Sequence, residues 1–139
     1  MTRPALSVGI AAAAIGGAIG AVARWGISDA FATSTGSFPW ATFAINLVGC
    51  TLLAALPAVP AIRRSAVLPV FLGTGVLGGF TTMSSASEQT FVLLDGGHVA
   101  VALSYALGTL VCALVAVRLV DLASTPIERA LIRDAEGDD

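Results

Sequence analysis

Charged side chains are scarce in this sequence. Only 12% of its 139 residues are charged, and none of them is lysine. An average soluble domain carries about 25% charged residues. Half of the charged side chains also fall within residues 121–139, so the first 120 residues share the other half. A soluble fold of this length could not cover its surface with so few. A soluble enzyme, a nucleic-acid-binding protein and a disordered chain are therefore all disfavoured.

Residues that build metal and catalytic sites are also few. The sequence has one histidine, His98, and two cysteines, Cys50 and Cys112. No cluster has the spacing of a metal site, and no nucleophile–base pair or phosphate-binding loop is present. Both cysteines lie inside apolar runs, where small packing residues are more typical than a disulfide. The sequence does not predict an enzyme.

Long uncharged runs are what the sequence does contain. They cover residues 5–23, 30–62, 65–87 and 96–117, the last with His98 as its only titratable side chain. About 20 apolar residues let a helix cross a bilayer, and helices are the default spanning element. We therefore predict an all-α integral membrane protein. Residues 1–120 form four transmembrane helices near 5–27, 39–60, 66–94 and 98–120, and residues 121–139 form a charged cytoplasmic tail with a short helix near 126–135.

Two alternatives bear on the first run. A signal peptide cleaved after residues 21–23 would remove it, but the run is longer than the usual apolar stretch of about 7–15 residues. A small multidrug-type four-helix exporter would need a carboxylate in this helix to exchange protons for cations, and residues 5–23 contain none. The run is thus better interpreted as a spanning helix without an ion-exchanging acid.

The arginines are distributed unevenly between the two ends of such a bundle. With the N-terminus in the cytoplasm, only Arg24 lies outside, and the others lie inside: Arg3, Arg63, Arg64, Arg118, Arg129 and Arg133. The positive-inside rule then predicts a single orientation in the cell membrane, with both termini cytoplasmic.

Glycines and hydroxyl residues mark the third run. The spacings Gly16-xxx-Gly20 and Gly75-xxx-Gly79 favour close helix packing and oligomerisation. The Gly78–Gly79 pair disfavours continuous helix and precedes five hydroxyl residues within 81–87, so a break is predicted near 78–82. Unwound backbone at membrane depth is tolerated where it lines a polar cavity, which favours an ion or solute path. The alternative is a kinked helix whose hydroxyls bond to their own carbonyls.

Polar side chains in the second and fourth runs fit a small solute. Asn46 lies in the middle of the second run, where an amide needs a partner: it can join helices or donate to an anion. Ser104, Tyr105 and Thr109 place hydroxyls on the fourth run. Hydroxyl and amide donors without a central carboxylate fit a small anion or a neutral solute better than a cation.

Three motifs in this order resemble the fluoride channel family, also called CrcB or Fluc. Residues 16–25 resemble its first-helix signature, which ends in arginine and an aromatic residue. Residues 42–50 are similar to its second-helix pattern with a central Asn-x-x-Gly, and residues 73–82 resemble the start of its third-helix break. The resemblance covers nearly the whole chain before the acidic tail.

The resemblance implies a dual-pore antiparallel dimer in which two crossing breaks hold a sodium ion. By position, the sodium ligands would be the backbone carbonyls of Gly78 and Thr81. The fluoride pathway would include Asn46, Ser84, Tyr105 and Thr109, and Arg24 would lie near a vestibule that attracts anions. Donors that replace water suit fluoride, which is small and strongly hydrated. The implied function is passive export of fluoride across the lipid bilayer, with no nucleic-acid partner.

The sequence departs from this family at two aromatic positions. The family usually has two phenylalanines that line the fluoride path, and Met83 and Ala86 stand at these positions here. The acidic residue that follows is matched only by Glu88 one position early, or by Gln89 in register. The strong arginine bias is also untypical of a homodimer that inserts both ways. We therefore predict one half of a heterodimer with an inverted paralogue. A homodimer and a non-conducting structural subunit remain as alternatives.

Overall fold

The computed structural model describes residues 4–123, and every regular element in this part is helical. The elements are α1 (Leu6–Ala30), α2 (Trp40–Ala55), η1 (Leu56–Ala58), α3 (Pro60–Arg63), η2 (Val70–Leu77), α4 (Gly78–Phe80), α5 (Met83–Asp95) and α6 (Val99–Ala123). The all-helical prediction is confirmed for these residues. The short helix predicted near 126–135 lies outside the described residues.

Three helices are long and apolar enough to cross a membrane. They cover Leu6–Ala30, Trp40–Ala58 and Val99–Ala123, and each begins within one residue of its predicted start. The second span, predicted near 39–60, tightens into the 3-10 turn η1 and ends two residues earlier, before the extended residue Val59. The third predicted span, 66–94, is divided into η2, α4 and α5, so none of its pieces reaches a membrane-spanning length.

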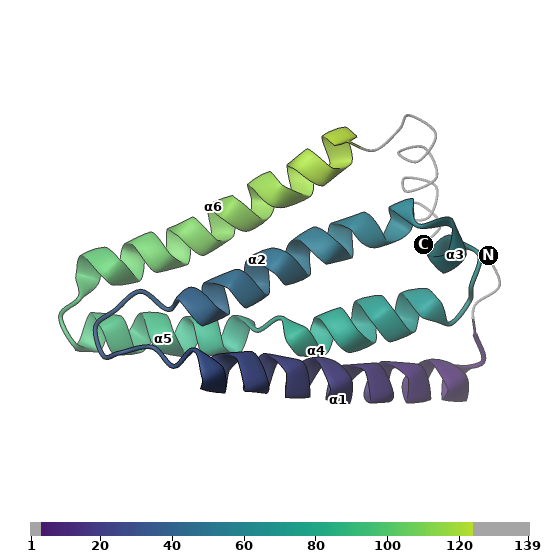
Figure 1. The fold of residues 1–139 in the computed structure, drawn as a ribbon, viewed down its shortest axis with the longest axis horizontal. Coiled ribbons are helices and arrows are strands. Elements are labelled where there is room, and N and C mark those ends of the chain that lie inside the picture. Colours follow the sequence, from purple (N-terminus) through teal and green to yellow (C-terminus); the bar gives the residue numbers. More distant parts are fainter. Residues whose placement is uncertain (1–3, 124–139) are drawn as a thin grey trace.

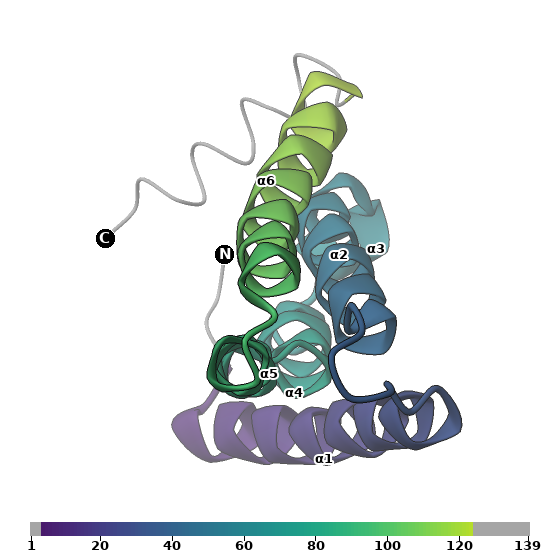
Figure 2. The same cartoon turned by 90° about the vertical axis from the view of Figure 1, so that its left-hand side faces the viewer.

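The third segment changes packing partners along its length. Its first part, η2 and α4, packs against α1, and its second part, α5, packs against α6. Figure 1 shows α4 and α5 in one row, with α1 on one side and α2 and α6 on the other. Figure 2, seen from one end, shows α1 passing across this row. The residues between α4 and α5 therefore lie where the two packing regions meet.

Glycine allows α1 to approach η2 and α4 closely. A Cβ atom at Gly16 would collide with the Phe71 carbonyl oxygen, and one at Gly20 with the Val76 carbonyl oxygen. A Cβ atom at Gly79 would collide with the Gly17 backbone. The predicted small-xxx-small contact is thus an intramolecular one between α1 and the first part of the third segment.

A small core lies near the other end of the row. Leu93, Ala102 and Tyr105 are buried together, with Phe38 and Ala86 among the side chains packed against them. Most large apolar side chains on α6 are instead exposed, as Leu107 (60%) and Leu114 (61%) illustrate. Such a surface is stable in lipid, where apolar side chains need no cover.

Candidate functional site

Thr81 and Thr82 interrupt the third segment. Their backbones are extended, with φ/ψ of −76°/155° at Thr81 and −149°/117° at Thr82. Thr82 also begins α5, since its Oγ1 accepts a hydrogen bond from the Ser85 N–H at 3.1 Å. This is the N-cap arrangement that threonine favours at a helix start. Helix therefore stops at Phe80 and restarts at Met83 with its first turn capped.

Asn46 on α2 holds the interrupted backbone by two hydrogen bonds. Its Nδ2 donates to the Thr82 carbonyl oxygen at 3.0 Å, and its Oδ1 accepts from the Thr82 N–H at 2.8 Å. The side chain is only 8% exposed. The amide thus pairs with both backbone groups of one extended residue, as a neighbouring β-strand would. Of the two uses predicted for this amide, the structure displays the bond between segments.

Arg24 on α1 holds the other side of the interruption. Its Nε donates to the Gly79 carbonyl oxygen at 3.2 Å, and the side chain is half-buried. A guanidinium has five N–H donors, so others remain for a further acceptor. The resemblance implies that Arg24 lies near a vestibule, and this role stays a prediction; the structure shows its Nε bonded to Gly79 of α4.

The interruption leaves the carbonyls of residues 78–81 without the N–H donors of a continuous helix, and the structure shows where two of these donors go. In a continuous helix the Gly78 carbonyl would accept from the Thr82 N–H, which donates to Asn46 instead. The Thr81 carbonyl would accept from the Ser85 N–H, which donates to Thr82 Oγ1 instead. Gly78 and Thr81 are the two residues whose carbonyls the resemblance assigns to sodium.

The interruption lies within the predicted range 78–82, at the two threonines rather than at the two glycines. Gly78 is helical, with φ of −64° and ψ of −37°, and positive φ values among the described glycines occur only at Gly36 and Gly97. Gly79 is needed for its close approach to Gly17 rather than for unusual dihedral angles. Threonines therefore form the break, and the glycines bring α1 next to it.

A cavity of about 590 Å³ lies beside the interruption. Its lining combines polar and apolar side chains from α2, α5, α6 and the interruption: Asn46, Cys50, Thr81, Thr82, Met83, Ala86, Ser87, Thr90, Phe91, Leu94, Tyr105, Ala106, Thr109, Leu110 and Ala113. The fold thus brings together Asn46, Tyr105 and Thr109, as well as both altered aromatic positions. Ser84 is exposed and does not line this cavity.

Several threonine hydroxyls near this cavity are bonded to their own helices. Thr109 Oγ1 donates to the Tyr105 carbonyl at 2.7 Å, Thr90 Oγ1 to the Ala86 carbonyl at 2.8 Å, and Thr81 Oγ1 to the Leu77 carbonyl at 3.0 Å. Such bonds satisfy the hydroxyl proton but leave the oxygen as an acceptor. The alternative of back-bonded hydroxyls therefore applies to these three residues.

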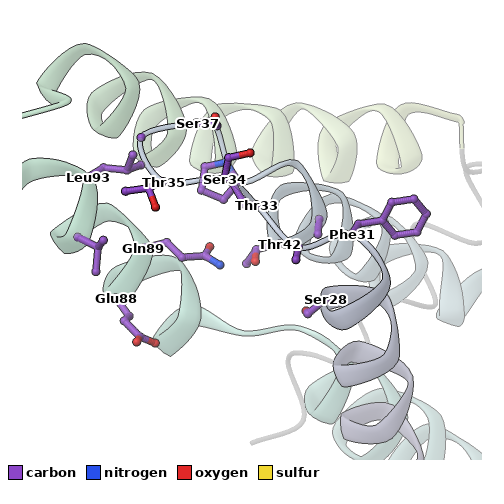
Figure 3. A pocket seen from close by; sticks show the side chains of 15 residues that line it. Ser28, Phe31, Thr33, Ser34, Thr35, Ser37, Thr42, Glu88, Gln89 and Leu93 are labelled. Carbon is purple, nitrogen blue, oxygen red and sulfur yellow. The ribbon is translucent and has the colours of Figure 1, made fainter. Parts of the chain in front are cut away.

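A second cavity of about 420 Å³ lies at the end of the bundle where α1 connects to α2. Figure 3 shows its lining, in which Thr35 of the connection is directed toward Gln89 on α5. The lining residues are Ser28, Phe31, Ala32, Thr33, Ser34, Thr35, Gly36, Ser37, Pro39, Ala41, Thr42, Glu88, Gln89, Val92 and Leu93. Most of its hydroxyls come from residues 33–37, a loop outside the predicted spans, so the sequence motifs give no indication of this cavity.

One hydrogen bond connects the two cavities. Tyr105 lines the first cavity and Gln89 the second, and the Tyr105 hydroxyl donates to Gln89 Oε1 at 2.7 Å. Tyr105 is completely buried, and Phe38 contacts its ring edge-on at 5.3 Å. Gln89 is absent from the predicted pathway. The only signal for it in the sequence is its place in register with an acidic residue of the resembling family.

Comparison with known proteins identifies the family. A family model described as "CrcB-like protein, Camphor Resistance (CrcB)" matches residues 11–120. The "Fluoride-specific ion channel FluC" of Paracoccus denitrificans is 42% identical over 104 residues, which are 75% of this chain and 84% of that protein. "Fluoride-specific ion channel FluC 1" of Streptomyces coelicolor is 40% identical over 112 residues, 79% of this chain and 73% of the relative.

A third relative agrees with these. A "Fluoride-specific ion channel FluC" of Thermus thermophilus is 44% identical over 103 residues, which are 70% of this chain and 79% of the relative. All three names describe ion channels rather than enzymes, and the apolar helices agree with a multi-pass membrane protein. The family match covers nearly all of the described residues, and this chain is therefore a member of the CrcB-like protein family.

Proposed function

We propose that this chain is a subunit of a fluoride-selective channel that lets fluoride leave the cytoplasm passively and so limits its toxicity. The observation that carries the proposal is the match over residues 11–120 together with relatives named as fluoride-specific channels. The geometry is compatible with it, because Asn46, Tyr105 and Thr109 gather around one cavity beside the interrupted backbone. Replacing the water around a small anion requires hydrogen-bond donors, and Asn46 has a second N–H for this, whereas the hydroxyl protons of Tyr105 and Thr109 are donated to Gln89 Oε1 and to the Tyr105 carbonyl in this structure.

We assign the sequence-derived pathway residues as follows. One N–H of Asn46 is bonded to Thr82, and an amide has a second N–H that can face the cavity. Tyr105 and Thr109 form the wall of this cavity on α6. Ser84 is exposed on the first turn of α5 and contributes once another subunit covers that turn. Only the Nε of Arg24 is bonded to Gly79, so its other N–H groups can attract anions.

Gly78 and Thr81 fit a structural sodium ion. Their carbonyls have lost their helical donors to Asn46 and to the Thr82 hydroxyl. Backbone carbonyl oxygens are suitable ligands for a hard monovalent cation, and unwound backbone in membrane helices supplies them. Two carbonyls from one chain are too few for a complete shell. We therefore propose that a second, crossing break supplies the others.

We propose that the complete channel is an antiparallel dimer of four-helix subunits with a broken third segment, and that the partner is an inverted paralogue. The described arginines support this arrangement. Arg63 is the last residue of α3 and Arg64 follows it. Arg118 lies near the C-terminal end of α6, which is at the same end of the bundle as α3 (Figure 1). Arg24 lies on the opposite half of the bundle, where its Nε donates to the Gly79 carbonyl of α4. This asymmetry favours one orientation for this chain, with both termini cytoplasmic.

The proposal predicts a difference between two preparations. The first is the channel purified from its own host through a tag on this chain, so that any partner subunit is retained. The second is this chain expressed alone. After reconstitution into liposomes loaded with potassium fluoride, the first preparation should release fluoride to an electrode and chloride-loaded liposomes should release almost nothing. The chain alone should release little fluoride, because its inverted partner is missing.

Each outcome has a separate meaning. Full efflux from the chain expressed alone would contradict the heterodimer and favour a homodimer. Absence of fluoride efflux from the host-purified channel would contradict the channel function itself.

The absence of aromatic side chains at Met83 and Ala86 favours a second candidate function, a structural subunit that supports a conducting partner. Substitution of Asn46, discussed below, separates this candidate from a conducting role.

A further inference from the structure

Two adjacent arginines lie at the corner between the second span and the third segment. Arg63 ends α3 and Arg64 follows it, before the chain enters η2. They are the only charged side chains in residues 30–87. Figure 1 shows α3 at one end of the bundle, beside the last turns of α2. Because the segments on both sides are apolar and extend into the bundle, the two charges lie where hydrocarbon gives way to lipid headgroups.

These two charges are not compensated by the rest of the described chain. Within residues 4–123, Arg118 at the same end of the bundle is paired with Asp121 at 2.6 Å, whereas no acidic side chain contacts Arg63 or Arg64. Arg64 is exposed, and its guanidinium makes no hydrogen bond to any of these residues. The corner therefore presents a local positive charge that an anionic group from outside the chain can neutralise.

The corner itself holds Arg63 in place. Its Nη1 donates to the Pro57 carbonyl oxygen in η1 at 3.1 Å, and the residue is half-buried. Most of the five N–H donors of the guanidinium are not used by this single bond. Donors that are already fixed lose little conformational freedom when they bind a ligand. Guanidinium groups also match the geometry of phosphate oxygens.

Exposed apolar side chains flank the arginines. Val59, which precedes α3, is 43% exposed, and Leu68, which precedes η2, is 37% exposed. Ile62 lies between them and is buried, so it anchors α3 to the bundle. A phospholipid offers the matching chemistry, because its phosphate is followed directly by acyl chains. A soluble anion would match the arginines but not these apolar neighbours.

We propose that Arg63 and Arg64 bind the headgroup phosphate of an anionic phospholipid in the leaflet that surrounds this end of the bundle. Val59 and Leu68 then lie against its acyl chains. In the orientation proposed above this is the cytoplasmic leaflet, where anionic lipids attract basic segments next to spanning helices. The binding does not depend on fluoride conduction.

The test adds lipid to the channel purified from its host, with any partner subunit, in a neutral detergent. Native mass spectrometry counts the bound dioleoylphosphatidylglycerol, and dioleoylphosphatidylcholine is the uncharged comparison. Arg64→Gln should weaken the binding of one phosphatidylglycerol about fivefold, as expected for one arginine at an anionic lipid surface. Arg64→Lys keeps the charge and should retain most of the binding. The double variant Arg63→Gln, Arg64→Gln should weaken it further.

Arg118→Gln is the matched control, since it removes the same charge at the same end of the bundle from an arginine already paired with Asp121. Its phosphatidylglycerol binding should equal that of the wild type. Size-exclusion chromatography reports the assembly of each variant.

Two results would overturn the lipid site. Wild-type phosphatidylglycerol binding by the double variant would leave the arginines with a role in membrane insertion alone. Equal binding of phosphatidylglycerol and phosphatidylcholine by the wild type would show that the arginines do not select an anionic lipid. A wild-type channel that binds phosphatidylglycerol as expected but releases no fluoride would instead overturn the proposed function and leave the lipid site intact.

Discussion

Asn46→Ala is expected to reduce fluoride efflux at least about tenfold. The substitution removes both hydrogen bonds that hold Thr82, each contributing about 0.5–1.5 kcal/mol. It also leaves the Thr82 N–H and carbonyl without these partners inside the bundle. A loss of about 1.4 kcal/mol from the conducting arrangement already corresponds to tenfold in rate. Efflux of the host-purified channel from fluoride-loaded liposomes measures the effect.

The same substitution tests the sodium assignment. Once Thr82 is released from Asn46, its N–H can donate to the Gly78 carbonyl, which is one of the proposed sodium ligands. We therefore expect the Asn46→Ala channel to require more sodium for its residual efflux and for its thermal stability. Both are measured by titrating sodium against N-methylglucamine at constant ionic strength. An unchanged sodium requirement would argue against sodium at Gly78 and Thr81.

Cys50→Ala is the matched control for this prediction. Cys50 lies one turn after Asn46 on α2, lines the same cavity and is a free cysteine. Its replacement should leave efflux and sodium dependence nearly unchanged. If Asn46→Ala behaves like Cys50→Ala in an assembled channel, this chain does not contribute a conducting pathway. The structural-subunit candidate would then be favoured.

Gly20→Ala is expected to prevent correct assembly of the bundle. The added Cβ would collide with the Val76 carbonyl oxygen and would lie 2.8 Å from the Phe80 nitrogen. Both obstacles are backbone atoms, so no side-chain rotation relieves them, and α1 must move away from η2 and α4. Overpacking of this kind costs about 1–3 kcal/mol. The displacement would also pull Arg24 away from Gly79.

The measurements are the yield of monodisperse channel, its thermal unfolding temperature and its fluoride efflux, all of which should fall. Gly26→Ala on the same helix is the control, because nothing lies within 4 Å of a Cβ atom added there. Alanine is also the better helix former, so this variant should be at least as stable as the wild type. Equal behaviour of the two variants would mean that α1 does not pack on η2 as described.

The spans were predictable because hydrophobic length is a local property of the chain. The predicted starts at 5, 39 and 98 differ by one residue from those of α1, α2 and α6. The exact position of the interruption was less predictable. Glycine has both conformational freedom and small size, and the sequence does not reveal which one matters. At Gly79 the small size matters, and the extended conformation falls on Thr81 and Thr82.

The candidate site was predictable in its residues but not in their partners. Asn46 and Tyr105 were identifiable because polar groups inside an apolar run need partners, whereas Arg24 was identifiable only from the resemblance. Those partners are Thr82, Gln89 and Gly79, at separations of 36, 16 and 55 residues along the chain. Such pairings depend on how the helices pack, which one sequence does not specify. Gln89 was missed for this reason, since its significance arises only from its contact with Tyr105.

The exposed polar face of α5 has a consequence for how much channel a cell can assemble. α5 has 13 residues, about 20 Å of helix, and Ser84, Ser87 and Glu88 are exposed on it. A lone copy would present these groups to lipid, which solvates hydroxyls and carboxylates poorly. In the heterodimer proposed above, a surplus of one subunit would leave these groups uncovered, so balanced synthesis of the two halves would set how much channel assembles.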